Sequence, residues 1–355
     1  MDIIAETVEG FEEECKTEIG ELIDSPENTR KVYPGYIGLE VAKKDIYRLN
    51  YGSGTINRIV AVSDRFELED PEDCYERIDI TPSEYIEKDQ TFAVKVVREG
   101  EHDFSSVDVA KEAGQKIVDR FRKKEGETLS VDLDNPDIVF RLYLFGKKAY
   151  FGIDTTGRPL NDRNYMEEEP EVPPILANCL VRSSNWEPGE KLLDPFTRQG
   201  VVAIEAGRIE SKAPNTQRKF GFLDSKFFSN RDYAEIASEM NEQMIEEPTD
   251  IKGSDKTVSE AERNAERANV KVEFEEVTAL EQDVDSYHIV FDAPYLPEKS
   301  KRAQIAGYLK EFEQKLYRKN PESVTCTSRS EEFFEKMEKE REVVWDTFRA
   351  EVFRN

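Results

Sequence analysis

The hydrophobic and polar positions of residues 1–60 switch between a strand pattern and a helix pattern. Ile3-Ile4-Ala5 forms a short apolar run, and residues 36–41 again have strand character. Between them, residues 10–23 place apolar side chains at near-helical spacing. These side chains are Phe11, Cys15, Ile19 and Leu22. The pattern predicts a small α+β unit over residues 1–60.

Residues 61–155 show a second round of the same patterns. Residues 91–97 alternate like a half-buried strand, and a polar loop follows. Ser105-Ser106 then precedes a predicted helix over residues 107–121, with apolar residues at four-residue steps. Residues 139–143 and 149–153 are further expected strands. We therefore expect a second α+β unit over residues 61–155.

Residues 156–174 are rich in turn-forming residues and predict a linker. The linker contains an acidic run, Glu167-Glu168-Glu169-Pro170-Glu171, which we expect to be solvated.

From residue 175 onward, helix patterns alternate with short apolar strands. Three strands should end in aspartates, at Asp194, Asp255 and Asp292. Further strands are expected at 270–274, 324–327 and 343–353, and helices around 202–209, around 261–268 and up to about Tyr317. Such alternation predicts an α/β fold, a doubly wound Rossmann-like sheet over residues 175–355, with ligands at the carboxyl ends of its strands.

Charge is the most unusual feature of the composition. Charged residues make up 35% of the 355 residues, and the formal net charge is -26. Two interpretations compete: a protein that repels nucleic acid, or a surface built for high salt, where long-range charge is screened. Because the acidity is spread along the whole chain, we favour the second, although Lys is not depleted relative to Arg.

Several classes of protein are disfavoured by the sequence. The four cysteines are far apart and form no CxxC pair, which argues against a disulfide scaffold or a zinc site. Neither His102 nor His288 suggests a metal site. No apolar run approaches the roughly 18 residues that a membrane span needs, and no signal peptide is evident. We expect a cytoplasmic protein without a metal.

Asp292-Ala293-Pro294-Tyr295 is the stretch most suggestive of chemistry, because it follows the apolar run Ile289-Val290-Phe291. A tetrapeptide of Asp or Asn, a small residue or Pro, Pro and an aromatic can hold a flat base and accept hydrogen bonds from its exocyclic amine. This points to methyl transfer onto a nucleobase nitrogen. The alternative is an ordinary turn that ends a strand.

The order of motifs along nearly the whole chain resembles the THUMP-domain methyltransferases that modify guanine N2 in RNA. The resemblance is strongest to the branch of archaeal tRNA and bacterial 23S rRNA enzymes. The matching stretches are Phe92–Gly114, Ile153–Gly157 with Arg163-Asn164-Tyr165, Leu193–Phe196 with Gly200, Ala213–Phe222 and Gly253–Asp255. The resemblance implies a ferredoxin-like unit at 1–60, a THUMP RNA-binding domain at 61–155 and a Rossmann-like methyltransferase domain at 175–355.

The resemblance implies S-adenosylmethionine as cofactor and assigns residues to it. Asp194 would favour its ammonium group, and Asp255 its ribose hydroxyls, unless Asp255 caps the following helix instead. The full cofactor set is Asp194, Phe196, Thr197, Gly200, Asp255 and Thr278. Asp292 and the carbonyl of Ala293 would accept the hydrogens of the base amine, while Pro294 shapes the turn and Tyr295 stacks on the base.

The chain departs from the family pattern in the cofactor loop, Asp194-Pro195-Phe196-Thr197-Arg198-Gln199-Gly200. The family usually has Cys-Gly-Ser-Gly after Phe, so Arg198 replaces a glycine. Its side chain would obstruct the cofactor or point away and contact RNA. Thr278, Ala293 and Leu296 are further departures: a carboxylate, Pro or Leu, and Gly usually stand at these positions.

A partner RNA, tRNA or rRNA, is the remaining expectation. Cations concentrate in the second unit, and ordinary surface charge is the competing explanation for each. The RNA-binding candidates are Arg98, Lys111, Lys116, Lys123, Lys124 and, through its motif, Arg163. We expect a guanine-N2 methyltransferase acting on the tRNA acceptor region, as a monomer. A degenerate RNA-binding relative and an adenine-amine methyltransferase are the alternatives.

Overall fold

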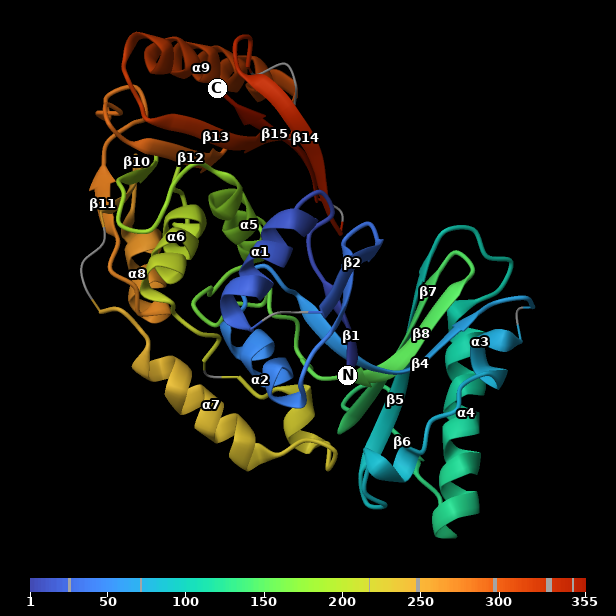
Figure 1. The fold of residues 1–355 in the computed structure, drawn as a ribbon. Coiled ribbons are helices and arrows are strands. Elements are labelled where there is room, and N and C mark those ends of the chain that lie inside the picture. Colours follow the sequence, from blue (N-terminus) through green and yellow to red (C-terminus); the bar gives the residue numbers. More distant parts are fainter. Residues whose placement is uncertain are drawn as a thin grey trace.

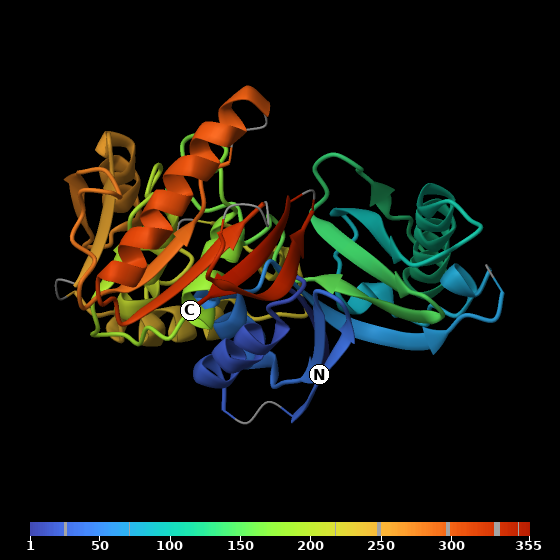
Figure 2. The ribbon, with the colours of Figure 1, turned by 90° about the horizontal axis from the view of Figure 1, so that it is seen from above.

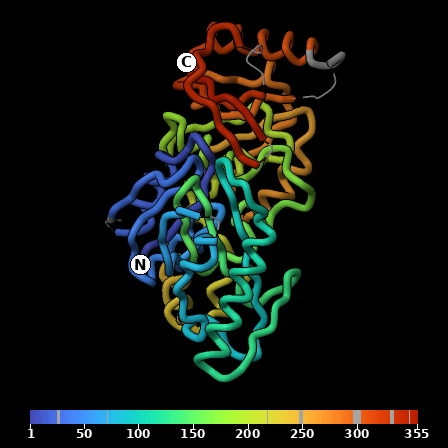
Figure 3. Tube along the Cα trace, turned by 90° about the vertical axis from the view of Figure 1, so that its right-hand side faces the viewer, coloured from blue at the N-terminus to red at the C-terminus, as the bar shows by residue number. Residues whose placement is uncertain are grey.

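A computed structural model describes residues 1–355 except 25–26, 71, 217, 247–249, 296–298, 330–333 and 347, and omits the side chains of Glu27 and residues 299–302. Figure 1 shows two sheets with helices packed on them. In Figure 3 the N-terminal unit, in dark blue, lies beside the part formed by residues 61–155, and the C-terminal sheet, in red and orange, lies at the top of the view. Within the described residues, no helix is long and apolar enough to cross a membrane.

The first sheet joins both N-terminal units. In the described part of the chain it has eight strands in the order β2-β3-β1-β4-β8-β7-β5-β6. One strand, β4, runs through residue 60, where we place the boundary between the two units, and that boundary stays a prediction. The strands are β1 (Asp2–Glu6), β2 (Glu27–Tyr33), β3 (Tyr36–Glu40), β4 (Arg58–Glu67), β5 (Thr91–Glu99), β6 (Ser130–Val131), β7 (Ile138–Phe145) and β8 (Lys148–Asp154).

Helices cover this sheet and share its core. The long helix α4 begins after Ser105, whose hydroxyl accepts a hydrogen bond from the Val107 amide, and ends at Gly126 in a left-handed conformation. Its buried face carries Val109, Ala113 and Ile117, as the spacing predicts. The helices are α1 (Glu12–Leu22), α2 (Lys43–Gly52), α3 (Asp73–Glu76), the 3-10 turn η1 (Pro82–Glu84) and α4 (Ser106–Glu125).

The second sheet has the order β11-β10-β9-β12-β13-β15-β14 among the residues described. Strands β11, β10, β9, β12 and β13 are parallel to one another. Strand β15 is antiparallel to β13, and β14 is antiparallel to β15. In Figure 2, α9 lies across one face of this sheet. The strands are β9 (Leu192–Asp194), β10 (Ile251–Asp255), β11 (Glu273–Glu276), β12 (His288–Asp292), β13 (Ser323–Ser328), β14 (Glu338–Trp345) and β15 (Phe348–Arg354). The helices are α5 (Pro174–Ser183), α6 (Val201–Ser211), η2 (Gly221–Asp224), α7 (Asn230–Glu242), α8 (Ser259–Ala268) and α9 (Lys299–Arg318).

The strand order reverses at β9. The chain proceeds outward from β9 to β10 and β11, then returns to place β12 on the other side of β9. Such a switch point leaves a crevice outside the carboxyl ends of the strands, where α/β proteins bind ligands. The three expected aspartates, Asp194, Asp255 and Asp292, end the three strands at this switch.

Two predicted elements need correction. The strand expected over 270–274 begins only at Glu273. The segment 343–353, expected as one strand, contains the end of β14, a turn and most of β15, and Trp345 pairs with Phe348 across this hairpin. Asp346 adopts a positive φ of 50° there, a turn without the Gly or Pro that normally reveals one in a sequence.

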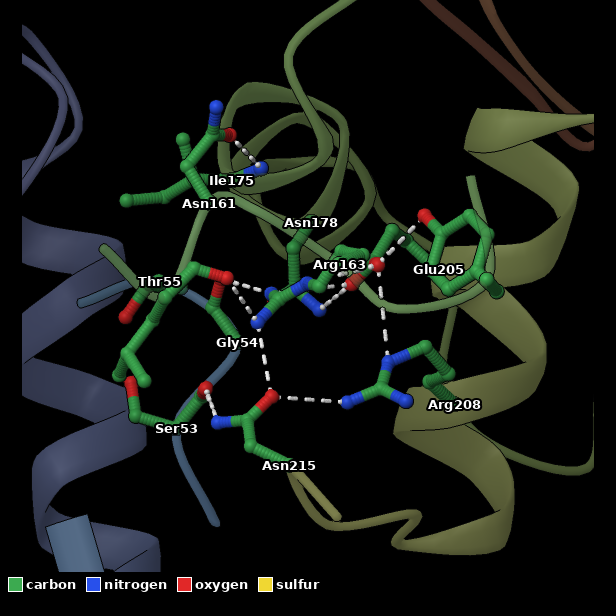
Figure 4. A network of polar contacts seen from close by, with 12 residues as sticks. Ser53, Gly54, Thr55, Asn161, Arg163, Ile175, Asn178, Glu205, Arg208 and Asn215 are labelled. Carbon is green, nitrogen blue, oxygen red and sulfur yellow. Dashed lines mark hydrogen bonds and ion pairs between the residues drawn. The ribbon is translucent and has the colours of Figure 1, made fainter. Parts of the chain in front are cut away.

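A buried polar network joins the N-terminal unit to helices α5 and α6 of the C-terminal part (Figure 4). Arg163 is 5% exposed, and its guanidinium bonds to Glu205 (Nε to Oε1, 3.2 Å) and to the Gly54 carbonyl (2.9 Å). Asn178 donates to the same Glu205 carboxylate at 2.8 Å, and the hydroxyl of Tyr165 does so at 2.9 Å. The expectation that Arg163 binds RNA is therefore wrong, because its guanidinium is buried and paired with the Glu205 carboxylate.

Candidate active site

The loop after β9 is held in place by its own residues and by β10. The carboxylate of Asp194 accepts a hydrogen bond from the Phe196 amide (3.2 Å), and the Thr197 amide donates to the Ser254 carbonyl (3.1 Å). Gly200 ends the loop at φ 86° and begins α6. A Cβ at Gly253 would lie 2.5 Å from the Thr197 hydroxyl, so only glycine allows this close approach of loop and strand.

Phe196 anchors this loop rather than exposing its ring. The ring packs against Phe291 and Phe312, with centroids 5.1 Å away in both cases. Any contact of Phe196 with a ligand is thus left to its backbone. The aromatic side chain instead ties the loop to β12 and α9, and so fixes the distance between the Asp194 and Asp292 strand ends.

Asp194 is 1% exposed, and within the described part of the chain no cation lies at ion-pair distance from it. Burial raises the pKa of Asp194 to about 7. The hydrogen bond from Phe196 and the charge of Arg198 oppose this shift without cancelling it. A positively charged ligand group beside Asp194 would supply the missing counter-charge.

Asp255 does not cap the following helix. Helix α8 has Val258 as its N-cap residue, with no side-chain cap bond. The two carboxylate oxygens of Asp255 instead accept hydrogen bonds from the backbone amides of Lys256 (2.7 Å) and Arg198 (3.2 Å). Asp255 is partly exposed at the end of β10, which leaves its remaining lone pairs for a ligand.

Asp292 lies at the end of β12 and is 1% exposed. Its Oδ1 accepts a hydrogen bond from the Thr327 hydroxyl (2.7 Å), and the Ala293 amide donates to the Thr327 carbonyl (2.8 Å). Tyr295 is half-buried, and the Arg329 guanidinium lies 5.4 Å from the centre of its ring. Pro294, which precedes Tyr295 in the chain, is also half-buried. Leu296 lies outside the described residues.

The Arg198 side chain does not point away from the site, and the expectation that it obstructs the cofactor stays a prediction. Its guanidinium donates to the Asp292 carboxylate (Nη2 to Oδ2, 2.8 Å) and to the Glu171 carboxylate (Nη1 to Oε2, 2.8 Å). The backbone amide of Glu171 donates a hydrogen bond to the side-chain oxygen of Gln199 at 2.9 Å. All four glutamates of the acidic run are exposed, as expected, and two of them also form ion pairs, Glu171 with Arg198 and Glu167 with Arg267.

Thr278 follows β11, and its hydroxyl donates to Glu281 at 2.6 Å. It is half-buried, and its assignment to the cofactor adenine stays a prediction.

The remaining RNA-binding candidates lie on β5 and α4. Arg98, Lys111, Lys123 and Lys124 are exposed. Lys116 is half-buried and donates to the Glu76 carbonyl, and burial lowers the pKa of its ammonium group. Their role in RNA binding stays a prediction, with Lys116 the least accessible of them.

Comparison with known proteins agrees with this geometry. Residues 163–352 match the family described as RMKL-like, methyltransferase domain, and residues 70–154 match the THUMP domain. The chain belongs to the RMKL-like methyltransferase family. The resemblance found in the sequence is thereby confirmed, and the α/β methyltransferase fold with a THUMP domain is as expected.

Relatives of this RMKL-like methyltransferase include two archaeal enzymes named tRNA (guanine(6)-N2)-methyltransferase. The one from Archaeoglobus fulgidus is 30% identical over 74% of this chain and 66% of its own length. The one from Methanocaldococcus jannaschii is 30% identical over 76% of this chain and 73% of its own length. The aligned part thus spans about two thirds to three quarters of these relatives.

Solved structures share the fold over nearly the full chain. The crystal structure of a possible methylase from Clostridium difficile 630 superimposes with a TM-score of 0.89 at 22% identity, covering 99% of this chain and 97% of that one. The crystal structure of TrmN from Thermus thermophilus gives a TM-score of 0.73 at 20% identity, covering 99% and 98%. At these identities the likeness establishes the architecture.

Proposed function

We propose that this RMKL-like methyltransferase transfers a methyl group from S-adenosylmethionine to guanine N2 in tRNA. The observation that carries the proposal is the placement of Asp292-Ala293-Pro294-Tyr295 at the carboxyl end of β12, beside the β9 switch point. A THUMP domain on the same chain and two tRNA guanine-N2 methyltransferases among its relatives support RNA, and guanine, as the substrate.

The residues at the switch point fit S-adenosylmethionine, which supplies a methyl group on a sulfonium when bound. The observation that supports the fit is the buried, unpaired Asp194 carboxylate, which a cofactor ammonium group would neutralise. Asp255 would accept the ribose hydroxyls, as a charge-assisted acceptor. The backbone of loop 195–200 and Thr278 would hold the methionine and adenine parts.

The protein's contribution to the reaction is positioning. Guanine N2 is a weak nucleophile, because its lone pair is shared with the ring, and it reacts only when held in line with the methyl group. Asp292 and the Ala293 carbonyl would accept its two hydrogens and localise the lone pair. The nitrogen so held would accept the methyl group that the bound cofactor supplies and would lose one of its two protons afterwards.

The base must reach this pocket from a folded RNA. Unstacking a base costs a few kcal/mol, and stacking on an aromatic ring such as Tyr295 returns about 1–3 kcal/mol. The THUMP part would hold the RNA through phosphate contacts while the acceptor pocket receives one guanine. The names of the relatives make guanine 6 of tRNA, in the acceptor stem, the position we propose.

The decisive test is a methylation assay. Purified protein, S-adenosylmethionine and tRNA transcripts should yield N2-methylguanosine on mass analysis of the nucleosides, and a transcript lacking guanine 6 should not. N6-methyladenosine as the only product would show an adenine-amine methyltransferase instead. Cofactor-independent RNA binding without any methylated nucleoside would identify a degenerate relative.

Cofactor affinity should depend on pH through Asp194. The pKa of Asp194 is raised to about 7 by burial, so the carboxylate is mostly neutral at pH 6 and ionised above 7. Because the ionised form attracts the cofactor ammonium, affinity should increase roughly five- to tenfold from pH 6 to pH 7.5. Calorimetric titration measures this. Asp194→Asn should bind more weakly and lose the pH dependence, and an unchanged profile in that variant would contradict the role.

A further inference from the structure

Arg198 holds a backbone conformation that an arginine rarely adopts. Its φ is 46°, in the left-handed region that costs a residue with a Cβ roughly 1 kcal/mol, and glycine nothing. The family glycine at this position is therefore the residue that the backbone itself favours. An arginine retained in a strained conformation at a ligand site points to a contribution from its side chain.

The Arg198 side chain spans the acceptor site and is fixed at both ends. Nη2 donates to the Asp292 carboxylate (2.8 Å) and lies 3.3 Å from the Asp292 carbonyl, while Nη1 bonds to Glu171. The Arg198 backbone amide is held by Asp255 at 3.2 Å. Its side chain is 20% exposed, whereas that of Asp292 is fully buried. The pair is thus shielded from the solvent that weakens surface ion pairs.

The Asp292 carboxylate keeps lone pairs that no described residue uses. An ionised carboxylate offers about four lone-pair positions. Thr327 occupies one on Oδ1 and Arg198 one on Oδ2, and because the carboxylate is fully buried, a base amine would reach the others only by displacing groups that cover them. Removing one partner of a buried pair is costly, and Arg198 therefore stays in place as the base binds.

We propose that Arg198 is a positioning residue of the acceptor site, which anchors the buried Asp292 carboxylate in one orientation for the base amine. This inference rests on the proposed function. The titratable groups that face the pair are Glu171 from the linker, Asp194 at the end of β9, Asp255 at the end of β10 and the Cys326 thiol on the adjacent strand β13. Arg198 is the cation bonded to Asp292 in the described residues, and it balances a charge that the neutral Asn of this motif would not carry.

The pair predicts a rescue that independent residues would not show. R198G leaves the buried Asp292 carboxylate without its counter-ion and without the bond that orients it. D292N leaves a guanidinium whose charge repels the positive charge developing on the base nitrogen. D292N/R198G removes both charges together and recreates the neutral pairing of Asn with Gly.

The test measures single-turnover methylation at saturating RNA and cofactor, with the cofactor dissociation constant measured in parallel. We expect R198G to slow methylation 10- to 100-fold, with a dissociation constant within about threefold of the wild type. R198N, which tolerates the left-handed region but is too short to reach Asp292, should match R198G, and R198K should retain more activity. D292N/R198G should be about tenfold faster than D292N. Wild-type rates in R198G, or a double variant whose loss is the product of the two single losses, would overturn the inference.

Failure of the proposed function is distinguishable from failure of this inference. If the wild type methylates no RNA, the proposed function fails, and thermal melting of the wild type, R198G, D292N and D292N/R198G then tests the ion pair. If the two charges are coupled, the decrease in melting temperature of D292N/R198G should be smaller than the sum of the decreases in D292N and R198G. Melting shifts that simply add would overturn the inference as well.

Discussion

Asp292→Ala should abolish methyl transfer, lowering the single-turnover rate by at least a hundredfold while leaving cofactor affinity within a few-fold. The substitution removes the acceptor for the base amine and leaves the Arg198 guanidinium unpaired at the pocket. Loss of one aimed hydrogen-bonding group at a reacting centre typically costs 10²–10³ in rate. The measurement pairs single-turnover methylation with calorimetric titration of the cofactor.

Asp285→Ala is the matched control for this result. Asp285 precedes the amino end of β12, is half-buried and pairs with Lys319 at 3.0 Å. It lies at the opposite end of the strand from Asp292, so its loss should leave the rate unchanged. Undiminished turnover in Asp292→Ala would refute the acceptor role, and parallel loss of cofactor binding would point to a collapsed site instead.

Glu205→Ala should be the most destabilising single change at the junction of the N-terminal unit and the methyltransferase sheet. Glu205 is fully buried and neutralises Arg163, with Arg208 3.5 Å from the same oxygen. Removing it leaves two buried guanidinium groups with one carboxylate fewer, and breaking a buried ion pair in this way costs about 3–5 kcal/mol. Urea unfolding followed by circular dichroism measures the loss.

Glu205→Gln is the conservative variant for this prediction, and Glu266→Ala is its surface control. The glutamine keeps the shape and an oxygen for Asn178 but not the charge, so its loss should be intermediate. Glu266 is exposed on α8, and its removal should change the free energy of unfolding by less than about 0.5 kcal/mol. A loss below 1 kcal/mol in Glu205→Ala would mean that other groups carry the junction.

The elements with the clearest local patterns were predictable. Helix α4 was evident from four-residue apolar steps after Ser105, and β12 from three apolar residues before Asp292. Helix α7 was missed, since it lies in an insertion, and its packing on α2 through Arg48–Glu239 and Tyr51–Asn241 depends on distant partners. The β14–β15 hairpin was read as one strand, because its turn residue Asp346 resembles ordinary strand-flanking sequence.

In the candidate site, too, some features follow from local sequence and others do not. The aspartates at three strand ends follow from short-range order, because an apolar run that ends in Asp marks a strand's carboxyl end wherever the sheet lies. The partners of those aspartates do not follow from it. Arg198 meets Asp292 across 94 residues of sequence and Glu171 across 27, contacts that exist only because β9 and β12 are neighbours.

By itself, the sequence determined the α/β class, the family and the chemical identity of the strand-end residues, because these depend on local periodicity and on short motifs. Only the tertiary structure decided that Arg163 is a buried cross-link, that Glu171 belongs to the site and that Arg198 neutralises the acceptor carboxylate. The physical reason is that burial and ion pairing are properties of the space between elements, and that space is set by the strand order and not by neighbours along the chain.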